Sequence, residues 1–168
     1  MGGHGRSVQG HVGRNRQGQF RSGDRDTNIL VYAEGVNGLD RPQAALNVLR
    51  RLPTAAALVP IQALGELYNV LIRKAGYATA DARARLVGWS MSYPTADTTR
   101  SALIAAADLA AAHRLGIWDS IMIAVAAENG CQLLLSEDLQ DGFIWSGLTV
   151  ANPFAAVGNP LLAALLPE

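Results

Sequence analysis

The segment 117–138, IWDSIMIAVAAENGCQLLLSED, determines the fold class of this chain. Its apolar residues predict a helix over 118–129, and Gly130 ends that helix. The apolar run 131–135 is typical of a strand that is buried on both faces, and residues 136–142 predict a loop. A helix that leads directly into a buried strand indicates an α/β fold.

The rest of the chain extends this pattern. We predict further helices over residues 42–52, 60–76, 79–91 and 98–114, and further strands over 56–59 and 148–151. Residues 29–33, ILVYA, fit either a buried strand or the first turns of a buried helix, and periodicity alone does not decide between them. The alternation of strands and helices predicts one domain over residues 25–155, with a central parallel sheet flanked by helices.

Composition and charge limit the organisation of the chain. Its 168 residues are 49% apolar, which is enough for one hydrophobic core. Residues 1–24 are rich in Gly and Arg and predict a disordered leader outside the domain, and residues 156–168 predict a C-terminal tail. Residues 1–25 hold five arginines and one aspartate, so the rest carries nine basic and thirteen acidic residues. An acidic domain does not bind a polyanion through bulk charge.

The sequence also argues against several classes of protein. Cys131 is the one cysteine, and we interpret it as a buried thiol that packs like a small apolar side chain. Together with three histidines it supplies neither a zinc site nor a Cys–His nucleophile pair. The chain has no apolar signal region and no apolar stretch of about 20 residues. We therefore expect a soluble, cytoplasmic protein without a membrane partner.

Four carboxylates stand beside apolar segments, where an unpartnered charge is costly: Asp26, Glu66, Asp119 and Asp138. The loops at the carboxyl ends of parallel strands converge, which would bring acids from several segments together. Four oxygen ligands without His or Cys favour a hard cation such as Mg²⁺ or Mn²⁺. Such a site suits phosphodiester hydrolysis.

Each acid also has a purely structural interpretation. Asp26 fits an Asx turn, Asp119 fits the first turn of a helix, and Asp138 fits a loop cap. Glu66 fits a polar helical stripe with Asn69. Other acids, Glu34 among them, are interpreted as lying on solvated faces, and Trp118 and Tyr68 are interpreted as core residues.

The ordered set of motifs is more specific than any one of them. DTNILVYA begins at Asp26, EL begins at Glu66, WDSIMIA begins at Trp118 and LLSEDLQDG begins at Leu134. In this order and spacing the motifs resemble the PIN-domain family, and most closely its VapC-type toxin ribonucleases of bacterial toxin–antitoxin pairs. The resemblance covers residues 26–154.

The resemblance implies a five-stranded parallel sheet between helices, with residues 29–33 beginning a helix. It implies an endoribonuclease that depends on Mg²⁺ or Mn²⁺. The metal ligands and catalytic acids would be Asp26, Glu66, Asp119 and Asp138, with Asn28 and Ser136 as polar supports and Asp141 as a further candidate. It also implies an RNA substrate, a small antitoxin whose tail covers the acidic site, and a homodimer.

The chain departs from the family just before Asp26. The family pattern requires an apolar central strand that ends at this aspartate, but residues 19–25 read QFRSGDR. Charges in a strand buried on both faces are costly. We therefore hypothesise a family member whose first strand is impaired, or whose natural beginning is not this leader.

Two other functions remain open at this stage. A DNA-directed nuclease would use the same acids, and substrate preference alone separates it from a ribonuclease. A non-catalytic module would act only through association with an antitoxin or with itself, and its acids would be relics.

Overall fold

The computed structural model describes residues 28–36, 40–52 and 57–165. The helices are α1 (Asn28–Ala33), α2 (Asp40–Arg51), α3 (Ile61–Arg73), α4 (Thr79–Ser92), α5 (Arg100–His113), α6 (Ile117–Glu128) and α7 (Pro160–Leu165). The strands are β1 (Val59–Pro60), β2 (Thr95–Ala96), β3 (Leu133–Leu135), β4 (Ile144–Trp145) and β5 (Leu148–Ala151). The mixed α/β class is confirmed, and the ambiguous run 29–33 is helical. The predicted leader 1–24 lies outside the described residues.

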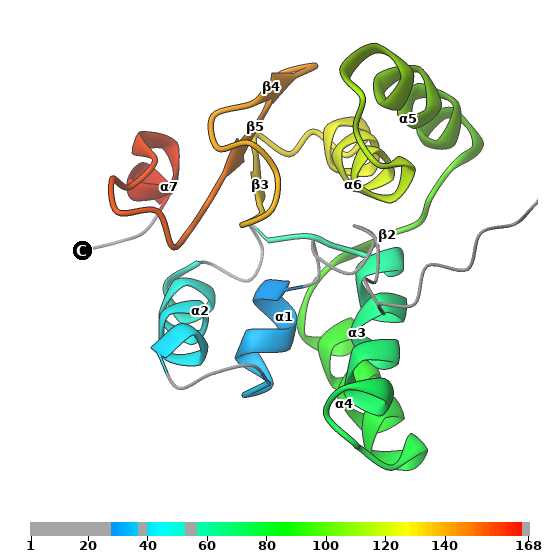
Figure 1. The fold of residues 1–168 in the computed structure, drawn as a ribbon, viewed down its shortest axis with the longest axis vertical. Helices are drawn as coiled ribbons and strands as arrows, with labels where there is room; N and C mark the ends of the chain where they lie inside the picture. Colours follow the sequence, from blue (N-terminus) through cyan, green and yellow to red (C-terminus); the bar gives the residue numbers. More distant parts are fainter. Residues whose placement is uncertain (1–27, 37–39, 53–56, 166–168) are drawn as a thin grey trace, which may run out of the picture.

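The strands form two sheets within the described part of the chain (Figure 1). β1 pairs in parallel with β2, and β3 pairs in parallel with β5. β4 runs antiparallel to β5, with Trp145 opposite Leu148. The described strands are therefore not all parallel, and the first, central strand of the expected five-stranded sheet lies outside the described residues.

A tight turn explains the antiparallel edge strand. Ser146 has φ 48° and Gly147 has φ 83°, and these two residues join β4 to β5. Positive φ at both central residues is the geometry of a type I′ turn, which matches the twist of a two-stranded hairpin. The Ser-Gly pair between apolar residues is the sequence signal for this hairpin.

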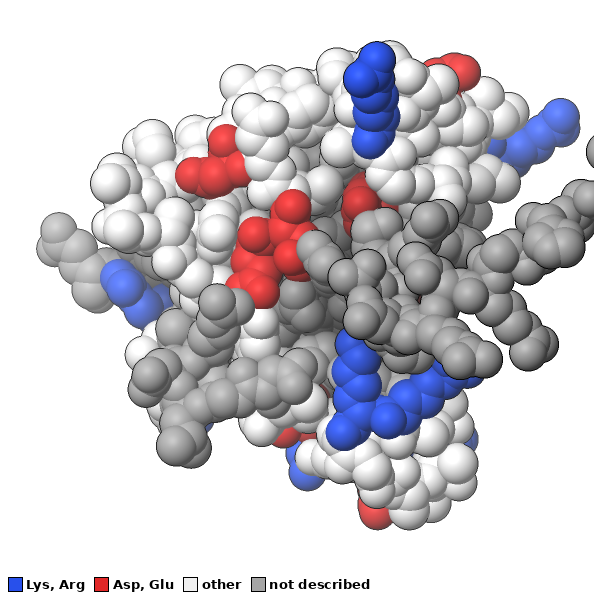
Figure 2. Space-filling view, in the orientation of Figure 1, with Lys and Arg blue, Asp and Glu red and all other residues white. Residues whose placement is uncertain are grey.

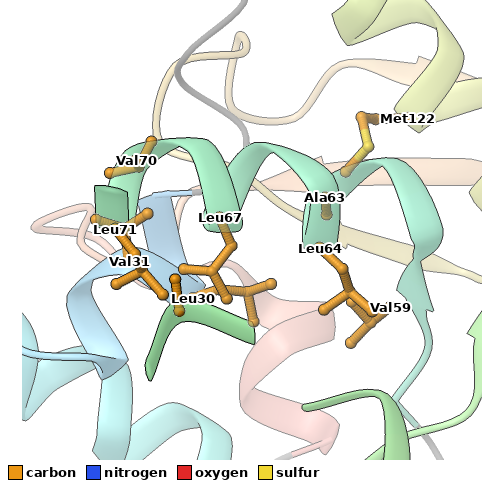
Figure 3. Close-up of a cluster of buried hydrophobic side chains, with 10 residues drawn as sticks. Leu30, Val31, Val59, Ala63, Leu64, Leu67, Val70, Leu71 and Met122 are labelled. Carbon is orange, nitrogen blue, oxygen red and sulfur yellow. The ribbon is translucent and has the colours of Figure 1, made fainter. Parts of the chain in front are cut away.

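The largest part of the core lies between α1, α3 and α4. Leu67 and Leu71 are completely buried on α3, and Figure 3 shows them pointing toward Leu30 and Val31 on α1. Tyr68 packs against the same cluster, as expected of a core residue. Since α1 buries its apolar residues here, it is fixed beside α3.

The helix α6 is the most deeply buried helix of the described structure. Every residue from Ser120 to Ala126 is buried, and α6 packs against α5. The helix ends at Gly130, which has φ 72°. The N–H of Cys131 donates to the carbonyl of Ala126, and that of Gly130 donates to Ala127, which is a Schellman cap. This cap turns the chain from α6 toward β3.

Several details differ from the sequence prediction. The strands β2 and β4 and the helix α7 were not predicted, because each is only two to six residues long. Trp118 is 54% exposed at the first turn of α6, so its interpretation as a core residue is wrong. Among the described residues, each helix is too short or too polar to pass through a bilayer.

Candidate functional site

Three of the four predicted ligands lie within the described residues, on three different elements. Glu66 is half-buried on α3, and Asp119 is half-buried in the first turn of α6. Asp138 is exposed in the loop after β3, so burial does not explain this acid. Asp26 lies outside the described residues, and Asn28 is described only as the first residue of α1.

Local structure explains part of the placement of Glu66 and Asp119. The amide Nε2 of Gln62, one helical turn earlier, donates to Oε1 of Glu66 at 3.0 Å. Asp119 follows the N-cap residue Gly116, which supplies no side-chain cap. A carboxylate in the first turn of a helix is stabilised by the unpaired N–H groups and the helix dipole. These positions are compatible with the structural interpretations given above, in which Glu66 belongs to a polar helical stripe and Asp119 to the first turn of a helix.

The loop that carries Asp138 is held from within by Ser136. This serine is 1% exposed, and its Oγ accepts from the backbone N–H groups of Asp138 at 3.3 Å and Leu139 at 3.2 Å. Its own N–H donates to the carbonyl of Ala151 at 3.0 Å, which extends the pairing of β3 with β5. Ser136 therefore supports the geometry of the Asp138 loop, and its participation in catalysis stays a prediction.

A second contact fixes the same loop to α1. The hydroxyl of Tyr32 donates to Oε1 of Glu137 at 2.7 Å across 105 positions of sequence. Tyr32 is 5% exposed, and its ring meets that of Phe154 edge-on at 5.7 Å. The sequence analysis missed this pair, which joins the element that follows Asp26 to the neighbour of Asp138.

Asp141 has a structural role in the described fold. Its Oδ1 accepts from the backbone N–H of Asn152 at 2.9 Å, which joins the loop to the residue after β5. One carboxylate oxygen of Asp141 therefore already accepts a backbone hydrogen bond. Its use as a metal ligand stays a prediction.

The types of ligand fit a hard cation, because all four predicted ligands are carboxylates. Acidic side chains lie near the middle of the face in Figure 2, with basic side chains lower on the same face. Within the described residues, however, no three His, Cys, Asp or Glu side chains come together as a metal-binding group. The four-ligand site stays a prediction, and its fourth member, Asp26, lies outside the described residues.

The structure corrects the interpretation of Glu34 as a solvated acid. Its side chain is 9% exposed, and the indole Nε1 of Trp89 donates to its Oε1 at 2.7 Å. The guanidinium of Arg85 lies 3.4 Å from its Oε2. Glu34 thus joins α1 to α4 rather than facing water. The sequence signal for this position is that Glu34 directly follows the apolar run 29–33, whose residues 29–32 are buried.

Two titratable groups outside the acid set have shifted pKa values. Hydrogen bonds from the hydroxyls of Ser101 and Thr99 lower the pKa of Glu128, which joins α6 to the start of α5. Burial raises the pKa of the Cys131 thiol. A raised thiol pKa reduces the thiolate fraction. Cys131 is half-buried rather than fully buried, and it packs against the cluster that contains Leu109 and Ile123.

A comparison with protein-family models finds a match. The family model described as PIN domain matches residues 25–140. The matched span contains all four predicted ligands and begins one residue before Asp26. No curated protein matches the chain.

Proposed function

Because this chain belongs to the PIN domain family, a nuclease superfamily, we propose that it is a divalent-metal-dependent endoribonuclease that hydrolyses RNA phosphodiester bonds. The observation that carries the proposal is the family match over residues 25–140, with four carboxylates at its ordered motifs. The finer assignment to RNA rests on the resemblance of these motifs to VapC-type toxins.

The proposed site uses carboxylates to bind the cation and backbone contacts to position them. Asp26, Glu66, Asp119 and Asp138 would hold Mg²⁺ or Mn²⁺. When bound, such a cation neutralises charge on a phosphate oxygen and activates water. Ser136 holds the Asp138 loop by accepting hydrogen bonds from two backbone N–H groups, one of which belongs to Asp138 itself.

We extend the proposal to the biological role that the resemblance implies. The chain would be the toxin of a type II toxin–antitoxin pair, with a small antitoxin as its partner and a homodimer as its assembly. The support is the order DTN, EL, WDSIMIA and LLSED along the chain. Co-expression with a candidate antitoxin should relieve growth arrest if this role is right.

The test of the enzymatic proposal is cleavage of a mixed RNA pool by the full chain. The reaction is run with Mn²⁺, with Mg²⁺ and with a chelator, for the natural sequence, Asp119→Asn and Asp108→Asn. Asp108 is an exposed acid on α5 outside the proposed set, so its variant is the matched control. We expect metal-dependent cleavage in the natural sequence and in Asp108→Asn, and its loss in Asp119→Asn. Equal cleavage by all three would refute the assigned site.

The same assay separates the proposal from a DNA-directed nuclease. Single-stranded and duplex DNA are offered at the same concentration as RNA, under the same metal conditions. Cleavage of DNA with no cleavage of RNA would replace the RNA assignment while leaving the acid set intact.

A specific observation keeps a non-catalytic module as the second candidate. Within the described residues, Glu66, Asp119 and Asp138 do not form a three-ligand group by themselves. If Asp26 completes the site, Mn²⁺ should stabilise the full chain by about 2.7 kcal/mol at 100 times its Kd. An unfolding midpoint that does not respond to Mn²⁺ or Mg²⁺, in a chain that does not cleave RNA, would favour the non-catalytic module.

A further inference from the structure

The indole of Trp118 lies at the surface in the first turn of α6. Trp118 is 54% exposed, whereas every other Phe, Tyr or Trp within the described ranges is buried or half-buried. Trp89 donates its indole N–H to Glu34 and stacks on Tyr93, and Trp145 packs against the core clusters beside α6. The fold therefore uses two of these indoles for internal contacts and presents the third to solvent.

The position of Trp118 makes this exposure informative, because a single exposed apolar residue is ordinary in itself. The next residue along α6 is Asp119, a proposed metal ligand, and the two Cα atoms are about 3.8 Å apart. Successive residues of a helix project about 100° apart, so the indole flanks the carboxylate and does not cover it. A phosphate held at Asp119 would thus bring an adjoining nucleotide to the indole.

The charge of the domain calls for a contact of this kind. Residues 26–168 carry nine basic and thirteen acidic residues, so bulk charge does not hold RNA on this domain. The stacking of a base on an aromatic ring needs no net charge and accepts any base. The exposed side chain of Arg114, in the loop before α6, adds a cation at the same end of the helix.

We propose that Trp118 is a stacking platform for a nucleobase next to the scissile phosphate. This role rests on the proposed nuclease function and adds to it a residue that holds the substrate base. The ligand is a base of single-stranded RNA, because unstacked bases can be splayed out onto aromatic side chains, whereas those within a duplex are not free to do so.

The test measures RNA binding without cleavage. A fluorescein-labelled single-stranded RNA of about eight nucleotides is titrated with the full chain in Ca²⁺, and a gel checks that the RNA stays intact. Trp118→Leu keeps an apolar side chain but removes the ring, and Trp118→Phe keeps a smaller ring. Ile144→Ala, at a side chain 67% exposed on β4, is the matched control.

The expected losses follow from the energy of stacking one base on an aromatic ring. We expect Trp118→Leu to weaken RNA binding by between about fivefold and about 150-fold. The affinity of Trp118→Phe should lie between those of Trp118→Leu and the natural chain. Ile144→Ala should bind as the natural chain does. Equal affinity of the natural chain and Trp118→Leu would overturn the proposal.

A cycle between protein and RNA separates stacking from a structural role of Trp118. Each position of the RNA is made abasic in turn, and every RNA is titrated with the natural chain and with Trp118→Leu. If Trp118 stacks a base, one abasic position should weaken binding by the natural chain but not binding by Trp118→Leu. A variant that only disturbs the fold would weaken binding of every RNA by the same factor, and that result would also overturn the proposal.

The failure of this inference and the failure of the nuclease proposal are distinguishable. Coupling between Trp118 and one base, in a chain that does not cleave RNA, would support the platform and refute the nuclease. Cleavage that is lost in Asp119→Asn, without any such coupling, would support the nuclease and overturn the platform. A chain that neither binds nor cleaves RNA would overturn both.

Discussion

The hydrogen bond between Tyr32 and Glu137 is the most informative contact to perturb. It joins α1 to the loop that carries Asp138, and its O···O distance is 2.7 Å. The substitution Tyr32→Phe removes the hydroxyl but retains the ring, so the edge-on contact with Phe154 is retained. Any loss of stability therefore reports on the hydroxyl and not on packing.

The expected magnitude follows from the charge of the acceptor. A hydrogen bond to a charged group contributes about 1.5–3 kcal/mol to stability, compared with about 0.5–1.5 kcal/mol for a neutral pair. Tyr32 is 5% exposed and Glu137 is half-buried, so water replaces the lost donor only in part. We expect Tyr32→Phe to lower the free energy of unfolding by about 1.5–3 kcal/mol at neutral pH.

The assay is urea denaturation of the natural chain, Tyr32→Phe, Glu137→Gln and the double variant. The double-mutant cycle separates this pair from the other interactions of either side chain. We expect a coupling energy of about 1 kcal/mol or more, because the two groups are in direct contact. Tyr68→Phe is the matched control on α3. A coupling energy near zero would refute the assignment of this bond as the attachment of the loop to α1.

The other predictions concern the core, the acid loop and pH. Leu67→Ala on the completely buried face of α3 should lower the free energy of unfolding by about 2–5 kcal/mol, whereas Met91→Ala, at a side chain 83% exposed, should leave the urea midpoint unchanged. Ser136→Ala removes the acceptor of two backbone N–H groups and should lower the free energy of unfolding by about 1–3 kcal/mol; unchanged stability would show that those groups find another acceptor. Hydroxyl donors lower the pKa of Glu128 in the folded chain, so its ionised form stabilises the fold above the ordinary value of 4.5 and this contribution is lost as pH falls through the lowered pKa. The midpoint difference between the natural chain and Glu128→Gln should therefore be largest at neutral pH and vanish in acid, and a difference that grows in acid would contradict this sign.

The helices could be predicted because their signals are local. The periodicity and the proline, glycine and cap positions predicted α2 to α6 within three residues at each end. Thr99, for example, caps α5 by accepting from the N–H of Ala102 at 3.0 Å, at the boundary where the sequence changes to an apolar helix. β5 was predicted with its observed bounds because three of its four residues are apolar and turn residues stand on both sides. Short strands without such a run, β2 and β4, gave no comparable signal.

The candidate site was less predictable because its contacts are remote in sequence. The four acids were identified from their order along the chain, but order does not show which side chains meet. Glu34 illustrates the limit, because its partner Trp89 lies 55 positions away on another helix. Tyr32 and Glu137 are separated by 105 positions, and only the packing of α1 against the loop brings them together.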